Sequence, residues 1–135
     1  MENLSKRTVG DVMSKAPRSI ESQQTLQLAR QWMDELKVHH LPVRERGKVV
    51  GILSDRDLAL TLGSVHSGAK SPVPMIVEDA MLTAVYSVSQ TTTVGQAARE
   101  MLEHRVGSVL VLGADDSLVG IFTDTDALKI LAKGT

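Results

Sequence analysis

Two short motifs place a hydroxyl group and a carboxylate three residues apart. They are Ser54 with Asp57, and Thr123 with Asp126, each at the point where an apolar run gives way to a helical pattern. A carboxylate can accept hydrogen bonds from both vicinal hydroxyls of a ribose, and a sheltered charge-assisted bond of this kind contributes ~1.5–3 kcal/mol. Backbone N–H groups at a helix start can bind a phosphate oxygen. The motifs therefore indicate contact with a sugar phosphate.

The same two motifs have an interpretation that needs no ligand. Ser-x-x-Asp and Thr-x-x-Asp resemble a capping box, in which the two side chains satisfy N–H groups of the first helical turn. Both roles can coexist at one position, so the sequence leaves both open.

Catalytic chemistry finds little support in the sequence. The chain has no cysteine, which excludes thiol nucleophiles, disulfides and thiolate metal sites. It also has no Gly-x-Ser-x-Gly elbow, phosphate-binding Walker loop or dinucleotide fingerprint. The histidines, at positions 39, 40, 66 and 104, do not have metal-ligand spacing. We expect no enzyme, no metal site and no obligatory cofactor, with Mg²⁺ entering only as the counter-ion of ATP.

Charge and hydropathy restrict the partners. Fifteen basic residues stand against 16 acidic ones, for a net charge of −1. Proteins that bind nucleic acid normally carry a basic excess, so we expect no nucleic-acid partner. The first residues open no apolar segment of signal-peptide length, and no run approaches the ~18–20 apolar residues of a membrane-spanning helix. A cytoplasmic protein without membrane contact is the prediction.

The chain contains an internal repeat. Asp-Val-Met at 11–13 recurs as Asp-Ala-Met at 79–81, and the heptapeptide at 51–57 recurs at 120–126. The register slips by one residue only, at the turn around 113–117. A Gly-, Ser- and Pro-rich stretch separates the copies. The predicted organisation is repeat 1 at 8–63, a linker at 64–75 and repeat 2 at 76–133.

Each copy reads as strand, helix, strand, strand, helix. Apolar residues at helical spacing mark one face of the first helix in each copy; they are Leu26, Ala29, Met33 and Leu36, then Val94, Ala97 and Met101. Two apolar runs joined by a short polar turn follow, which is typical of a β-hairpin. We expect the closing helices, about 55–62 and 124–132, to carry on their inner faces Leu58, Leu62, Ala127 and Leu131. An α/β (α+β) fold of two small sheets, each with two helices and packed side by side, is the prediction.

These residues resemble a known repeat. Asp-Val-Met at 11–13, His-Leu-Pro-Val at 40–43 and Gly-Ile-Leu-Ser-Asp-Arg-Asp-Leu at 51–58 are similar to the cystathionine-β-synthase-type (CBS) repeat, and the second half matches it again. The resemblance covers roughly 8–133. It implies a Bateman module, a pseudo-twofold disc of two CBS repeats with two clefts. Such modules commonly bind AMP, ADP, ATP or S-adenosylmethionine, pair into homodimers, and regulate an attached protein. Nothing is attached to the repeats in this sequence, so a stand-alone module with an unknown regulated partner is the expectation.

The resemblance also implies roles for individual residues. Asp57 and Asp126 would hold the ribose, with Ser54 and Thr123 beside them. The start of each hairpin would line the adenine pocket, through His40, Leu41 and Pro42 in the first copy and Ser108 and Val109 in the second. The segments that lead into each repeat would close the other wall, at Met13 to Pro17 and Met81 to Val85. The alternative for Leu41 and Val109 is an ordinary place in the strand core.

Phosphate groups would need cations. The candidates are Arg44, His40, Arg56, Lys70, His104 and Arg105, and the alternative for each is a solvated surface position. The two functions that remain open are a nucleotide-sensing regulatory module and a scaffold whose clefts are vestigial. Retention of both Ser/Thr-x-x-Asp motifs favours the first.

A homodimer is predicted through one flank of the first long helix. Leu28 and Trp32 lie four residues apart beside the core stripe, whereas the equivalent positions of the second copy are the polar Gln96 and Glu100. Tryptophan is enriched at the centres of interfaces. The competing interpretation is that Trp32 folds over the edge of its own domain.

Overall fold

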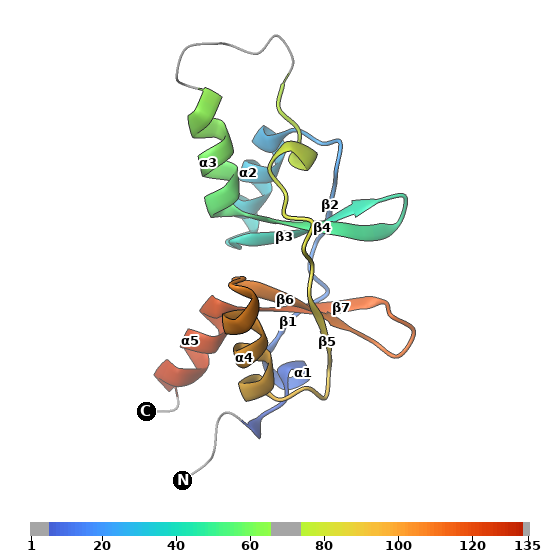
Figure 1. The fold of residues 1–135 in the computed structure, drawn as a ribbon, viewed down its shortest axis with the longest axis vertical. Coiled ribbons are helices and arrows are strands. Elements are labelled where there is room, and N and C mark those ends of the chain that lie inside the picture. Colours follow the sequence, from blue (N-terminus) through green and yellow to red (C-terminus); the bar gives the residue numbers. More distant parts are fainter. Residues whose placement is uncertain (1–5, 66–73, 134–135) are drawn as a thin grey trace. The chain divides into compact units, whose positions relative to one another are not determined.

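The chain divides into two compact units in the computed structural model, which describes residues 6–65 and 74–133. Unit 2 is the continuous segment Arg18–Val85. Unit 1 combines the residues up to Pro17 with those from Tyr86 onward. Figure 1 shows that helices and a small sheet occur in each unit.

Unit 2 contains a three-stranded sheet with two long helices. Its elements are β2 (Ile20–Glu21), α2 (Leu26–Leu36), β3 (His40–Glu45), β4 (Lys48–Ser54), α3 (Asp55–Val65) and a 3₁₀ helix, η2 (Val77–Asp79). The strand order is β2-β3-β4, with β2 parallel to β3 and β3 antiparallel to β4. Arg46 and Gly47 form the hairpin turn with positive φ angles of 52° and 79°, the backbone that a two-residue hairpin favours.

Unit 1 repeats this plan with one more strand. Its elements are α1 (Val9–Val12), β1 (Ser14–Lys15), β5 (Ser87–Ser89), α4 (Val94–His104), β6 (Ser108–Leu112), β7 (Leu118–Thr123) and α5 (Asp124–Lys133). The strand order is β1-β7-β6-β5. The predicted order of strand, helix, strand, strand, helix is confirmed in both units, as is the α/β fold class.

The first residues of each repeat, here called its lead-in segment, pack in the unit that the other repeat forms. In unit 1, β1 pairs with β7, so that Ser14 lies opposite Ile121. In unit 2, the backbones of Leu82 and Ile52 exchange two hydrogen bonds of 2.9 Å. The first residues of repeat 1 therefore complete the sheet of repeat 2, and the first residues of repeat 2 extend the sheet of repeat 1.

Two glycines at equivalent positions allow this exchange. A Cβ on Gly51 would lie 2.7 Å from the Met81 sulfur, and a Cβ on Gly120 would collide with the Met13 sulfur. Both glycines are buried on the strands β4 and β7. The methionine of each lead-in segment therefore packs in space that only a glycine leaves open.

Each unit has its own hydrophobic core. In unit 2 it includes Leu26, Ala29 and Met33 of α2, and in unit 1 Val94, Ala97 and Met101 of α4, which confirms most of the predicted helix faces. Two predicted core positions are wrong. Leu36 is 41% exposed, because α2 ends there and Lys37 adopts a left-handed conformation with φ 55°.

The second wrong core position is in α5. Leu131 is 60% exposed, whereas its neighbour Ile130 is buried. Around the helix axis, residue 130 lies ~60° to one side of residue 127 and residue 131 ~40° to the other, and the core lies on the side of residue 130. Both Ala127 and Ile130 pack in the core of unit 1.

Candidate nucleotide site

The motif of unit 2 lies at the junction of β4 and α3. Ser54 Oγ donates a hydrogen bond of 2.8 Å to Asp57 Oδ2 and accepts one of 3.0 Å from the Asp57 backbone N–H. Asp55 N–H donates to the His39 carbonyl oxygen at 2.9 Å. These bonds fix Ser54 and Asp57, both half-buried, at the first helical turn.

The motif of unit 1 lies at the junction of β7 and α5 and has one hydrogen bond more than that of unit 2. Asp126 Oδ2 accepts from the Thr123 hydroxyl at 3.1 Å and from the Thr123 backbone N–H at 3.0 Å, and Thr123 Oγ1 accepts from Asp126 N–H at 3.2 Å. The arrangement in unit 1 is a capping box, and in unit 2 the Ser54 hydroxyl caps the Asp57 N–H without the reciprocal bond, so the capping role is present in both. Because these bonds use only one oxygen of each aspartate, Oδ1 takes no part in them, and capping is compatible with ribose contact.

Strand register places the hairpin residues beside the motifs. His40 is the cross-strand partner of Ser54, and Ser108 is the partner of Thr123. Ser108 is one of few buried polar residues in the described chain. The residues implied for adenine and those implied for ribose are therefore neighbours in each unit.

The core interpretation holds for part of this set. Leu41 and Val109 are 1% exposed, and each belongs to the hydrophobic cluster of its unit. Pro42 is also buried on β3. Their side chains stabilise the units, so only the backbone groups and the flanking residues of these strands are open to a ligand role.

The exchange of lead-in segments decides which candidates come together. Unit 2 holds Ser54, Asp57, His40, Leu41, Pro42, Met81 and Val85, and unit 1 holds Thr123, Asp126, Ser108, Val109, Met13 and Pro17. The four lead-in residues named are all half-buried. Each unit thus combines one motif and one hairpin with the lead-in segment that begins the other repeat.

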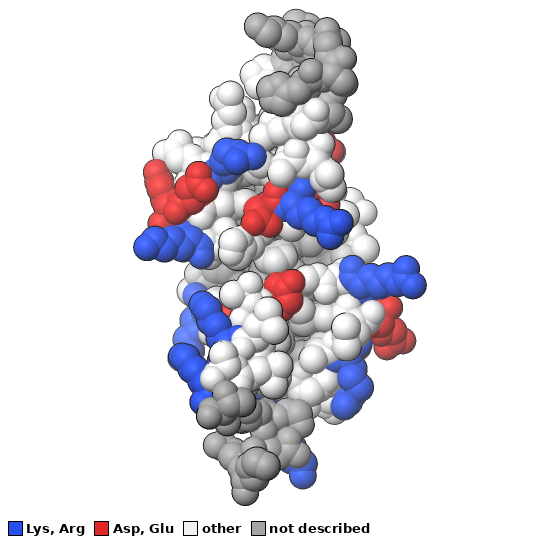
Figure 2. Space-filling model, turned by 90° about the vertical axis from the view of Figure 1, so that its left-hand side faces the viewer, with Lys and Arg blue, Asp and Glu red and all other residues white. Residues whose placement is uncertain are grey.

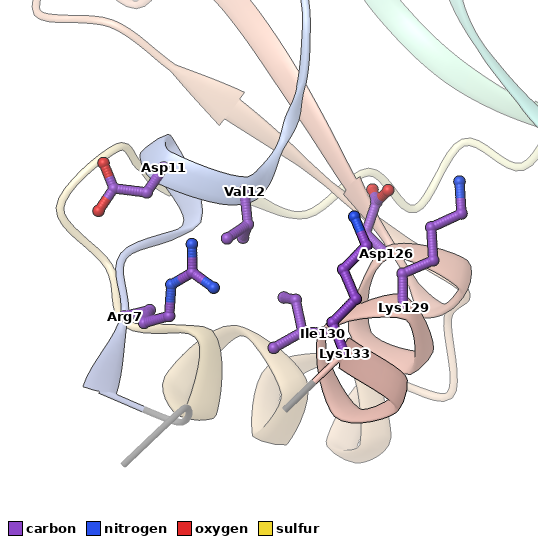
Figure 3. Close-up of a pocket in the computed structure, with 7 residues that line it drawn as sticks. All are labelled: Arg7, Asp11, Val12, Asp126, Lys129, Ile130 and Lys133. Carbon is purple, nitrogen blue, oxygen red and sulfur yellow. The ribbon is translucent and has the colours of Figure 1, made fainter. Parts of the chain in front are cut away.

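A pocket lies beside Asp126 in unit 1, with a volume of ≈ 330 Å³ (Figure 3). It is lined by Arg7, Asp11, Val12, Asp126, Lys129, Ile130 and Lys133. Sequence reasoning missed its three cations. The available signal was the spacing of Lys129 and Lys133 from Asp126, three and seven residues along one helix, which places them on the same face.

Most cations expected from the sequence have other surroundings. Arg44 donates from Nε to Ser19 Oγ at 2.7 Å and from a terminal nitrogen to the Gly47 carbonyl at 3.1 Å, which ties it to its own hairpin. The His104 ring stacks on Tyr86, with centroids 3.8 Å apart, and its Nε2 lies 3.2 Å from Glu100 Oε1. Arg56 and Arg105 are exposed. Lys70 lies outside the described residues.

The electrostatic surroundings are otherwise ordinary. On the face shown in Figure 2, basic side chains are interspersed with acidic ones. Hydrogen bonds from Ser117 lower the pKa of the Asp115 carboxyl, which lies in the β6–β7 turn and outside the site.

Within residues 6–65 and 74–133, no group of three or more acidic or histidine side chains is arranged to hold a metal ion. No helix of the described part is long and apolar enough to cross a membrane.

Sequence comparison assigns the family. The CBS domain model matches residues 9–64 and 77–133, and the chain belongs to this family as a CBS pair. The chain spans 39% of the length of one curated archaeal relative and 23% of that of a sulfurtransferase that it matches. Similarity to enzymes is therefore confined to part of those enzymes.

Solved structures give the same fold. A putative acetoin utilization protein from Vibrio cholerae is 30% identical, with a TM-score of 0.79 over 95% of this chain and 93% of that one. CBSX2 from Arabidopsis thaliana, solved in complex with AMP, is 28% identical with a TM-score of 0.73, covering 94% and 97%. The CBS pair of MJ0100, solved with 5′-methylthioadenosine and S-adenosylmethionine, is 24% identical with a TM-score of 0.82, covering 95% and 98%, and its likeness concerns the fold.

Proposed function

We propose that this CBS pair is a regulatory module that binds an adenosine-type nucleotide and passes its occupancy to a second copy or to another protein. The candidate ligands are AMP, ADP, ATP and S-adenosylmethionine. The observation that carries the proposal is the duplicated motif: both units hold a half-buried aspartate at a helix start, beside the first residue of a buried hairpin strand.

The geometry suits a ribose. Thr123 and Ser54 hold Oδ2 of their aspartates in hydrogen bonds of 3.1 and 2.8 Å, which orients the carboxylate and leaves Oδ1 for the vicinal hydroxyls. Partial burial strengthens charge-assisted hydrogen bonds because water competes less for the carboxylate. Adenine presents an apolar face and a donor–acceptor edge, which strand backbone and half-buried side chains can recognise.

The structural neighbours support the same ligand class. CBSX2 binds AMP, and the MJ0100 pair binds two adenosine derivatives that contain sulfur. The common part of the three ligands is the adenosine nucleoside. This part is what the motif and the hairpin of each unit would contact. The ligands therefore share the adenosine that is contacted and differ in the substituent at its 5′ position.

The second candidate function is a scaffold with vestigial ligand sites. Helix capping by the Ser54 hydroxyl in unit 2 and by the capping box in unit 1 favours it, since the motif has a structural role without any ligand. The two functions differ in one measurable respect, because only a sensing module is stabilised by nucleotides.

A thermal-shift screen of the chain against AMP, ADP, ATP, S-adenosylmethionine and adenosine tests the proposal, with GMP as the control for base recognition. A ligand that binds only the folded state at 100 times its Kd adds about 2.7 kcal/mol to the free energy of unfolding. We expect at least one adenosine compound to raise Tm and GMP to have a smaller effect. If no adenosine compound moves Tm at millimolar concentration, the sensing function is wrong.

A further inference from the structure

Three basic residues line the pocket beside Asp126. Arg7 precedes α1, and Lys129 and Lys133 lie on α5, so two segments far apart in the sequence contribute (Figure 3). Val12 and Ile130 give the pocket an apolar wall between α1 and α5. Its volume of ≈ 330 Å³ falls in the usual range for small-molecule sites, ~300–1,000 Å³.

Among the described residues, these cations take part in no ion pair. The ion pairs found among the described residues are His39–Asp55 and His104–Glu100, and neither involves the pocket. Two carboxylates also line it. Asp126 Oδ2 is bonded to Thr123, and the Asp11 side chain extends away from α5 in Figure 3. Positive charge therefore exceeds negative charge in the pocket, and an anionic ligand group would be attracted to it.

The other repeat lacks this cluster. In the repeat register that aligns Asp57 with Asp126, the positions of Lys129 and Lys133 are occupied by Leu60 and Ser64. The register of the lead-in segments puts Met75 in the place of Arg7. A requirement of the fold would apply to both repeats, as does the cap bond from the aspartate N–H to the Ser54 or Thr123 hydroxyl. The asymmetry points to a ligand group that only unit 1 receives.

We propose that the pocket of unit 1 binds the phosphate of the nucleotide whose ribose contacts Asp126, so that unit 1 selects phosphorylated nucleosides and unit 2 does not. The inference rests on the proposed function and specifies the ligand class of one of its two sites. A phosphate carries ~1.5–2 negative charges near pH 7 and three acceptor oxygens. Arg7 can bind it through two parallel N–H donors, and the lysines act as point charges. S-Adenosylmethionine, whose sulfonium is cationic, is disfavoured here.

The test compares AMP with adenosine, which differ only in the phosphate. Isothermal titration is done on the wild type, on Lys129→Met/Lys133→Met, and on Lys48→Met, a control that removes an exposed lysine from β4 of unit 2. We expect the double variant to bind AMP at least about tenfold more weakly, or about 1.4 kcal/mol, with adenosine affinity unchanged. Lys48→Met should resemble the wild type. Added salt should weaken AMP binding more than adenosine binding.

The remaining outcomes separate this inference from the proposed function. If adenosine and AMP lose affinity equally, or if AMP binding is unaffected, the phosphate assignment is wrong while nucleotide binding stands. If the wild type binds neither, and no other adenosine compound raises its Tm, the proposed function is wrong, and inorganic pyrophosphate becomes the probe. Changes in the amide chemical shifts of residues 7, 129 and 133 on addition of pyrophosphate would then support the anion site, and unchanged shifts would overturn it.

Discussion

Replacing Asp126 by asparagine separates ribose binding from helix capping. The asparagine side-chain oxygen can still accept the hydrogen bond from the Thr123 backbone N–H, which is 3.0 Å long in the native chain, and asparagine is a good residue at helix starts. The change in the free energy of unfolding should therefore stay under about 1 kcal/mol. The ribose bonds, in contrast, lose their charge assistance.

The expected loss of affinity follows from these bonds. A hydrogen bond to a charged group contributes ~1.5–3 kcal/mol, and a neutral one ~0.5–1.5 kcal/mol. For two hydroxyl contacts, the difference is roughly 2 kcal/mol, which is more than tenfold in Kd. Isothermal titration with AMP measures it, and urea unfolding measures the stability of the same variant.

Asp124→Asn is the matched control. Asp124 stands at the same helix start, but it is exposed and its Oδ1 accepts from the Thr125 backbone N–H at 2.8 Å. The Asp124→Asn variant should bind AMP with the same affinity as the wild type. Asp57→Asn makes the equivalent change in unit 2 and shows which unit is occupied. Unchanged AMP binding together with a large loss of stability in Asp126→Asn would refute the ribose role and leave capping alone.

Further predictions concern packing and assembly. Gly120→Ala should lower the free energy of unfolding by about 1–3 kcal/mol through overpacking against Met13, and Met13→Ala in the same chain should restore part of it; an unchanged urea midpoint would contradict the packing. Gly51→Ala should behave likewise, with Met81→Ala as its partner. The chain should be a homodimer by light scattering at micromolar concentration, and a monomeric wild type would contradict this. Trp32→Glu should chiefly lower the free energy of unfolding. A Trp32→Glu variant that is monomeric and as stable as the wild type would show instead that Trp32 belongs to the dimer interface.

The last of these expectations differs from the sequence-based one for a structural reason. Trp32 and Leu28 are half-buried and pack against the core of unit 2, and the guanidinium carbon of Arg18 lies 4.1 Å from the centroid of the Trp32 ring. These contacts favour the interpretation that Trp32 covers its own domain. Periodicity could identify the flank but could not show that Arg18 and the core would cover it.

The repeat, the element order and the family could be read from the sequence, because Asp57 and Asp126 stand in the same register of two similar halves. The exchange of the lead-in segments could not be predicted from the sequence. Gly51 and Gly120 are equivalent, as are Met13 and Met81, so local pattern allows either methionine to pack against either glycine. The spacing of Lys129 and Lys133 from Asp126 could have indicated two of the pocket cations, but Arg7 lies far from α5 in the sequence, and only tertiary folding brings it to the same pocket.

Amide chemical shifts measured during a titration with AMP test the central claim most directly. If the CBS pair binds the nucleotide through its duplicated motif, the amides of 54–57, 123–126 or both should shift saturably, together with the adjacent hairpin positions 40 and 108. Adenosine should shift the same motif amides, and GMP should shift them less. An AMP titration that leaves both motifs unshifted, or that moves only residues elsewhere, would contradict the account.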